Sequence, residues 1–145
     1  MSERTLPGGP IATADLVGTV AFAGSTALAS AWPGDGTDIA NLVVSGVLFL
    51  GGCAAFAAGF LRAAGRSRTE VVDLAGLFYL NGSSPRPVRR TLLGLWFAQI
   101  AIALLSVATV RPPFGVMAPV WGIGLLALWG ARHGTFPPRG PADRP

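Results

Sequence analysis

Residues 43–61 read VVSGVLFLGGCAAFAAGFL, a stretch that contains no charged side chain and ends one residue before Arg62. An α-helix needs about 20 apolar residues, each rising ~1.5 Å, to cross the ~30 Å hydrocarbon core of a bilayer. With its apolar flanks, the stretch extends over about 39–63 and predicts a helix that spans a membrane.

Three further segments of this chain have the same apolar character. They cover about 11–32, 91–110 and 114–131. The sequence PGDG at 33–36 separates the first two spans, and RPP at 111–113 separates the last two, so each pair is expected to form a helical hairpin. We therefore expect an all-α membrane protein, a four-transmembrane-helix bundle that forms a single membrane domain over residues 1–145.

The composition of the whole chain supports a membrane protein. About half of the 145 residues are apolar (51%) and only 12% are charged, whereas a soluble domain carries roughly 25% charge. All basic residues are arginine, and the net charge of +4 is too small to indicate a nucleic-acid partner. With one cysteine (Cys53) and one histidine (His133), the chain has too few ligands for a metal or haem site of its own, so no cofactor is expected.

The link between the second and third spans has local structure of its own. Ser67-Arg68-Thr69-Glu70 resembles a capping box, and Asn81-Gly82 is typical of a helix end. These signals predict a short helix over about 68–80, too short to cross a membrane and expected at the cytoplasmic interface. The tails, 1–10 and 132–145, are rich in proline and are expected to be loose.

The distribution of arginine predicts the orientation of the spans. The loop at 33–38 contains Asp35 and Asp38 and no arginine, whereas the link at 62–90 and the C-terminal tail together hold nine arginines. Arginine-rich loops stay on the cytoplasmic side, which places both termini in the cytoplasm and the chain in the plasma membrane. The alternative is cleavage of the first span as a signal sequence at Ala29-Ser30-Ala31, but Glu3 and Asp15 do not fit a signal sequence.

Three polar side chains within the spans are candidate functional residues: Asp15, Gln99 and Asn41. A buried charge in a membrane is costly, so Asp15 could serve as a proton or cation site. The alternative interpretation is that Asp15 lies near the cytoplasmic mouth, where it caps the span or pairs with Arg62 or Arg90. Gln99 and Asn41 are expected to form hydrogen bonds between helices.

Two further groups of residues stand out. Gly51, Ala55 and Gly59 recur every four residues and form a ridge that allows close helix packing, either within the chain or against a partner. Arg86, Arg89 and Arg90 precede the third span; they are either topology signals or contacts for anionic lipid or a phosphorylated substrate. Glu70 and Asp73 are expected on one edge of the short helix, where they could pair with these arginines or form a two-carboxylate site.

These features leave three classes of function open. The leading hypothesis is a non-enzymatic accessory or assembly subunit of a larger membrane complex, with the lipid bilayer and a membrane-protein partner or a second copy of the chain as its contacts. The second is a small oligomeric transporter or channel that uses Asp15 and Gln99. The third is an enzyme that acts on a lipid at the cytoplasmic interface through Glu70, Asp73 and the arginines before the third span.

Overall fold

A computed structural model of the chain describes residues 5–141. Its helices, in chain order, are α1 (Gly9–Ala31), α2 (Asp35–Arg66), α3 (Leu74–Phe78), α4 (Arg86–Thr109), the 3-10 helix η1 (Phe114–Met117) and α5 (Val120–His133). The protein is 75% helix, without strands in the described part. Four helices are long and apolar enough to cross a membrane, and η1 together with α5 makes the fourth, Phe114–His133. The expected all-α, four-helix architecture is confirmed.

Local sequence accounts for the helix ends. Pro10 and Pro87 stand in the first turns of α1 and α4, where a missing backbone N–H breaks no helical hydrogen bond. Asp35 and Asp38 lie in the first turn of α2 and Arg66 in its last turn, each sign complementing the helix dipole. Pro119 marks a break in the fourth span. It lies in the turn that follows η1, and α5 begins at the next residue.

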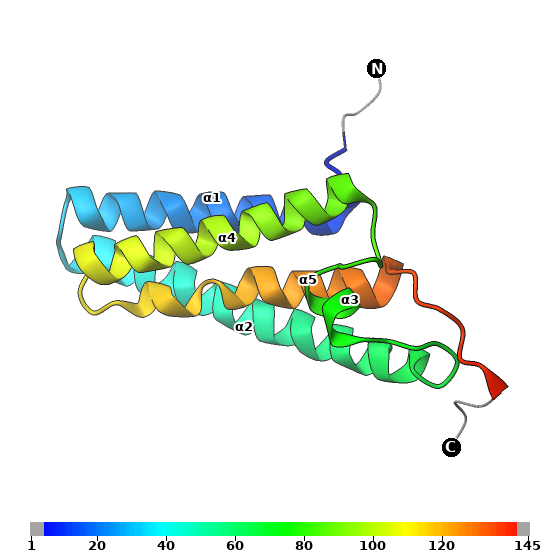
Figure 1. The fold of residues 1–145 in the computed structure, drawn as a ribbon. Coiled ribbons are helices and arrows are strands. Elements are labelled where there is room, and N and C mark those ends of the chain that lie inside the picture. The colour runs from blue at the N-terminus through cyan, green and yellow to red at the C-terminus, as the bar shows by residue number, and fades with distance from the viewer. Residues whose placement is uncertain (1–4, 142–145) are drawn as a thin grey trace.

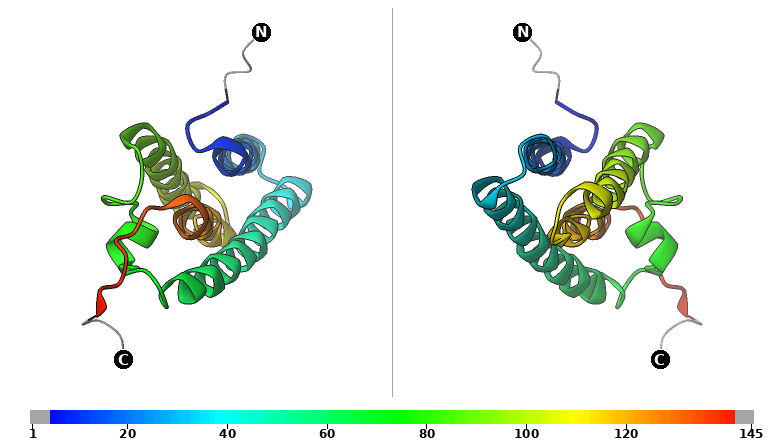
Figure 2. Two further views of the ribbon diagram at one scale, coloured as in Figure 1. Left: turned by 90° about the vertical axis from the view of Figure 1, so that its right-hand side faces the viewer. Right: turned by 90° about the vertical axis from the view of Figure 1, so that its left-hand side faces the viewer.

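Helix α5 lies at the centre of the bundle, with α1, α2, α3 and α4 around it (Figure 2). Its most extensive packing is against α2. In the most apolar window of the fourth span 56% of residues are buried, against 22–39% in the other three. The bundle is thus built around the last of its four long helices.

The two ends of the bundle differ in charge. The start of α1, the end of α2, the start of α4 and the end of α5 lie together with α3 at one end (Figure 1). We call this the arginine-rich end, because eight of the described arginines belong to it: Arg62, Arg66, Arg68, Arg86, Arg89, Arg90, Arg132 and Arg139. The opposite end holds the α1–α2 turn with Asp35 and the α4–η1 turn with Arg111.

The link between α2 and α4 differs from the expected helix over 68–80. Ser67 follows the end of α2, and the short helix α3 begins only at Leu74, where the Asp73 side chain accepts a hydrogen bond from the N–H of Gly76. Glu70 pairs instead with Arg66, the last residue of α2, at 2.7 Å. The capping-box interpretation was wrong, because Glu70, the glutamate that the box requires, forms an ion pair with Arg66. Glu70 and Asp73 therefore act separately, in an ion pair and a helix cap.

The C-terminal segment also differs from the expected loose tail. Residues 135–139 run alongside the α2–α3 link, where Val71 N–H donates to Pro137 O and Arg139 N–H to Thr69 O, both at 2.8 Å. Thr135 N–H donates to Ser83 O at 2.9 Å. We call this segment the C-terminal strap. The predictions for residues 1–4 and 142–145 fall outside the described residues.

Candidate functional site

Asp15 lies inside the bundle, on the face of α1 that meets α4. Its side chain is fully buried (0% exposed). Gln99 Nε2, on α4, donates to Asp15 Oδ1 at 2.7 Å and to Thr19 Oγ1 at 2.8 Å. Thr19 lies one turn further along α1 and donates its own hydroxyl to the backbone carbonyl of Asp15. One amide group therefore joins two polar side chains of α1 to α4.

The other end of the same amide reaches a third helix. Gln99 Oε1 accepts a hydrogen bond from the backbone N–H of Gly122 at 3.0 Å. Gly122 lies in the first turn of α5, where backbone N–H groups have no helical partner. The break at Pro119 creates this free donor in the middle of the fourth span, and Gln99 satisfies it as a capping side chain would. We call Asp15, Thr19, Gln99 and the Gly122 backbone the polar core.

One atom of the polar core lacks a partner. Asp15 Oδ2 is buried and receives no hydrogen bond from the described residues. The interpretation that Asp15 pairs with Arg62 or Arg90 was therefore wrong, because its partner is a neutral amide. Ser45 Oγ, on α2, is likewise buried without a partner among residues 5–141.

Asn41 joins α2 to α1 by side-chain hydrogen bonds. It is 1% exposed, and its Nδ2 donates to Ser25 Oγ at 3.2 Å and to Thr26 Oγ1 at 3.1 Å. Ser30 Oγ adds a hydrogen bond to Thr109 Oγ1 of α4 at 2.8 Å. The polar side chains of α1 thus meet α4 and α2 in turn, and each pair ties two helices together.

The small residues of α2 face α5. A Cβ on Gly59 would lie 2.8 Å from the backbone N of Leu128, and one on Gly51 would meet the ring of Trp121 at 2.7 Å. Ala55 packs against the main apolar core. Gly52, which the four-residue ridge did not include, comes closest to the α5 backbone, since a Cβ at this position would overlap the backbone carbonyl of Val120. Cys53 is exposed.

The arginines of the chain have different environments. Arg86, Arg89 and Arg90 begin α4, and Arg89 Nε donates to the carbonyl of Tyr79 at 3.1 Å. Arg66 was not singled out from sequence, yet its guanidinium contacts several groups at the arginine-rich end. Its guanidinium pairs with Glu70, donates to the carbonyls of Ala131 and Gly134, and lies 5.1 Å from the centre of the Phe136 ring. Arg66 thus connects α2 to the end of α5 and to the C-terminal strap.

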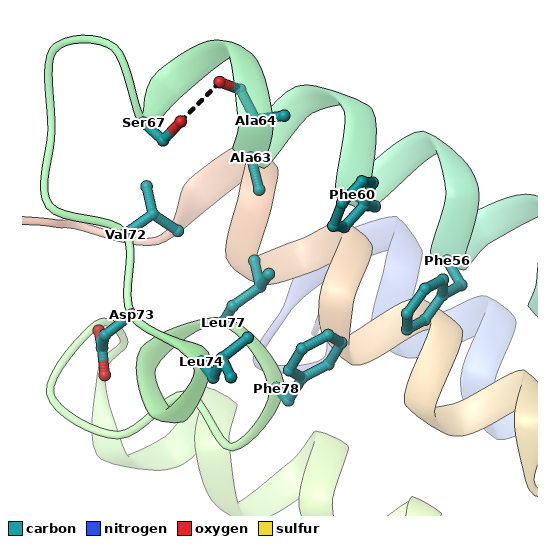
Figure 3. Close-up of a pocket in the computed structure, with 10 residues that line it drawn as sticks. All are labelled: Phe56, Phe60, Ala63, Ala64, Ser67, Val72, Asp73, Leu74, Leu77 and Phe78. Atoms are coloured by element: carbon teal, nitrogen blue, oxygen red, sulfur yellow. Dashed lines mark hydrogen bonds between the residues drawn. The ribbon is translucent and has the colours of Figure 1, made fainter. Parts of the chain in front are cut away.

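Two apolar grooves open on the surface of the bundle. The α1–α2 groove, of about 560 Å³, runs over Ala14, Gly18 and Val47 and has Trp121 in its lining. The indole Nε1 donates to the carbonyl of Ala14 at 3.2 Å. The α2–α3 groove, of about 430 Å³, lies between the end of α2 and α3 (Figure 3). Neither groove has Asp15 or Gln99 in its lining.

Within residues 5–141, no group of three His, Cys, Asp or Glu side chains lies close enough together to hold a metal ion. No protein-family model, curated protein or solved structure matches this chain. The arguments on function below therefore rest on its own geometry.

Proposed function

We propose that the chain is a multi-pass protein of the plasma membrane and acts as a non-enzymatic accessory or assembly subunit of a larger membrane complex. Four apolar helices of spanning length support insertion. The concentration of arginine at one end supports a cytoplasmic location for that end and for both termini, because basic loops resist transfer across the membrane.

The observation that carries the accessory role is the use of Gln99. Its donor and acceptor groups are taken up by Asp15 and Thr19 of α1 and by Gly122 of α5. The polar side chains that a transport pathway would need thus connect helices to one another. This arrangement favours a rigid bundle whose outer faces do the binding.

Helix α4 is the least buried of the four long helices, so its surface is the one we expect a partner to bind. Only 22% of its most apolar window is buried, and Phe97, Leu104 and Leu105 are more than half exposed. We expect the partner to cover this face, because interfaces within membranes form between apolar helix surfaces in close contact.

Photocrosslinking in the native host tests the accessory role. A photoreactive amino acid at Leu104 of α4 is expected to crosslink to one membrane protein in a constant ratio after mild detergent extraction. The same probe at Val47 of α2, which is similarly exposed (63% against 68%), serves as the control and is expected to label lipid. A chain that labels only lipid from both positions would contradict the proposal.

A small proton-coupled transporter is the second candidate, and the buried Asp15 Oδ2 without a partner favours it. A transport carboxylate must bind and release its proton or cation during the cycle. Asp15→Asn removes the charge and keeps the shape. Lost proton flux in reconstituted vesicles with normal recovery of the complex would establish transport, whereas an unchanged flux and complex would remove this candidate.

A further inference from the structure

The C-terminal strap and the α2–α3 link lie side by side as two extended segments of opposite direction (Figure 1). Glu70 and Pro138 stand opposite each other, and backbone hydrogen bonds of 2.8 Å join the two segments on either side of them. At such a position of an antiparallel pair the backbone of Pro138 points away from the link, so its missing N–H breaks no hydrogen bond between the segments. The edge of the link therefore accepts an extended segment that contains proline.

The ring of Phe136 anchors the strap in a slot between the end of α2 and α3. The guanidinium of Arg66 lies over the ring, with its carbon atom 5.1 Å from the ring centre, and a cation in this position attracts an aromatic face. The ion pair with Glu70 holds the guanidinium in place. Gly76 of α3 leaves room for the ring, because a Cβ there would lie 2.8 Å from Phe136 Cε1. The slot therefore has the shape and the charge that suit an aromatic side chain.

The remainder of the strap lies on the surface of the protein. Thr135, Pro137 and Pro138 are exposed, whereas Phe136 is partly buried. Segments with few buried contacts and solvent-exposed backbone hydrogen bonds open locally while the rest of a protein stays folded. Proline keeps such a segment extended when it is free, so little conformational entropy is lost when an equivalent segment binds. The strap is therefore suited to exchange with another segment of the same type.

We propose that Arg66, Gly76 and the α2–α3 link form a docking site for an extended segment of a partner protein, an aromatic residue followed by two prolines, and that the strap occupies this site within its own chain. The strap shows which chemistry the site accepts, and it keeps the site closed until a competing segment displaces it. Because the strap is joined directly to α5, its effective concentration at the site is on the order of millimolar. A competing segment must match this, as a segment of a subunit in the same complex does. The inference rests on the accessory role proposed above for the existence of a partner.

A labelled peptide with the sequence of residues 135–140, TFPPRG, is the probe of the site. Fluorescence anisotropy measures its binding to the full chain in a mild detergent. Phe136→Ala in the chain removes the anchor of the strap, so this variant is expected to bind the peptide at least about tenfold more tightly than the wild type, whose own strap competes at high effective concentration. The same peptide with alanine in place of its phenylalanine is the control and is expected not to bind. Equal affinity of the variant for the two peptides would overturn the proposal.

Closing the slot tests the place of the aromatic ring. Gly76→Ala, added to Phe136→Ala, places a methyl group where the ring of the peptide would lie and is expected to abolish binding of TFPPRG. Gly65→Ala, added to Phe136→Ala in the same way, is the matched control, because nothing lies within 4 Å of the added Cβ. Unchanged peptide binding by the Gly76→Ala variant would place the peptide elsewhere and overturn the proposal.

Hydrogen exchange of the wild-type chain gives a measurement that needs no variant. With excess TFPPRG the amide of Arg139, which belongs to the displaced strap, is expected to exchange faster. The amide of Val71, which belongs to the link and would donate to the peptide instead, is expected to stay protected. Unchanged exchange at Arg139 with bound peptide would overturn the proposal.

The crosslinking from Leu104 separates this inference from the accessory role. A chain that crosslinks to one membrane protein but does not bind TFPPRG loses only the docking site. A chain that binds TFPPRG but labels only lipid from Leu104 keeps the docking site and loses the accessory role.

Discussion

At the residue scale, Gln99 carries out the task of a helix cap from a different helix. A glutamine amide offers two donors and an acceptor, and this one is engaged on three groups: Asp15, Thr19 and Gly122. The need for such a cap comes from the break at Pro119, after which α5 starts within the fourth span and the Gly122 N–H has no backbone acceptor. In a bilayer no water is available to satisfy this group. Gln99 therefore compensates for the proline.

Gln99→Leu is expected to destabilise the bundle by about 1–3 kcal/mol, because it leaves the Asp15 carboxyl and the Gly122 N–H buried without a partner. Asp15→Asn is the control, since its side-chain oxygen still accepts the hydrogen bond from Gln99 Nε2 and its stability is expected to stay within about 1 kcal/mol of the wild type. Thermal unfolding in a mild detergent measures both. A wild-type midpoint for Gln99→Leu would show that the polar core contributes nothing to stability.

Two members of the polar core, Asp15 and Gln99, could be singled out from sequence, but their partnership could not, and neither could the contributions of Thr19 and the Gly122 backbone. Asp15, Gln99 and Asn41 are conspicuous as polar residues within apolar spans. Asp15 and Gln99 are 84 residues apart, and helical periodicity does not say how two helices are rotated toward each other. From sequence, Arg62 and Arg90 were the expected partners of Asp15. In the structure both belong to the arginine-rich end of the bundle, and Asp15 bonds Gln99 instead.

At the scale of elements, the contact between α2 and α5 depends on glycine at both helices. A Cβ on Gly124 would overlap the backbone of Gly52, so the two chains pass with no room for a side chain. The sequence predicted a small-residue ridge on α2, but the residues 51–59 contain seven glycines or alanines, which permit several ridges. Gly52 and Gly59, one heptad apart, make backbone contacts with α5, while Gly51 meets only the Trp121 side chain.

Gly52→Ala is expected to destabilise the protein by about 1–3 kcal/mol, because the added methyl group would push apart two backbones that are in contact. The matched control is Gly46→Ala on the same helix, where nothing lies within 4 Å of the added Cβ; this change is expected to be neutral or slightly stabilising. Resistance to heat in detergent compares the two variants. Equal midpoints would mean that α2 and α5 do not approach as closely as the structure has them.

The C-terminal strap is held at its start by Arg66. The side chain of Arg66 donates to the carbonyl of Ala131, in the last turn of α5, and to the carbonyl of Gly134, directly before the strap. A planar guanidinium reaches Glu70 and both carbonyls at once, which a lysine ammonium does not reproduce. The sequence indicated a loose tail, because a proline-rich segment such as 137–145 has no local pattern that predicts a strand or a helix. The pairing of the strap depends on Val71 and Thr69, which lie in a loop far away in the sequence.

Arg66→Lys is expected to release the strap while leaving the four long helices in place. Hydrogen exchange of the backbone amides reports this directly: those of Val71 and Arg139, which are bonded across the strap, should exchange faster by roughly tenfold for each ~1.4 kcal/mol lost. Arg132→Lys is the control, since Arg132 is exposed beside the same helix end. Exchange at wild-type rates in Arg66→Lys would show that the strap holds without the guanidinium.

At the scale of the whole molecule, arginine is concentrated at one end of the bundle, and this supports the topology proposed above. Eight of the described arginines gather at one end of the bundle, while Asp35, Asp38 and Arg111 lie at the other. An even number of spans with basic loops on one side agrees with both termini in the cytoplasm. The number of long apolar helices and their approximate limits followed from hydropathy alone, because apolar length is a local property of the sequence.

A reporter enzyme that is active only outside the cytoplasm tests this orientation. Fused after Pro33, in the α1–α2 turn, it is expected to be active; fused at Gly82 or after Arg139 it is expected to be silent. A fluorescent reporter that folds only in the cytoplasm is the control and should show the reverse pattern. Activity at Gly82 would invert the topology, and a mature chain that begins at Trp32 by mass spectrometry would remove α1 and Asp15 with it.

The central place of α5 has a consequence for how the protein is made. Of the four long helices it leaves the ribosome last, yet it is the one most enclosed by the others. Until α5 is made, the face of α2 with Gly52 and Gly59 has no helix against it. Gln99 Oε1 likewise lacks its hydrogen-bond donor, the N–H of Gly122. In a membrane, the faces of α1, α2 and α4 that later pack against α5 are therefore open to lipid until α5 is inserted. The contacts that complete the packing of the bundle can therefore form only after α5 has been synthesised.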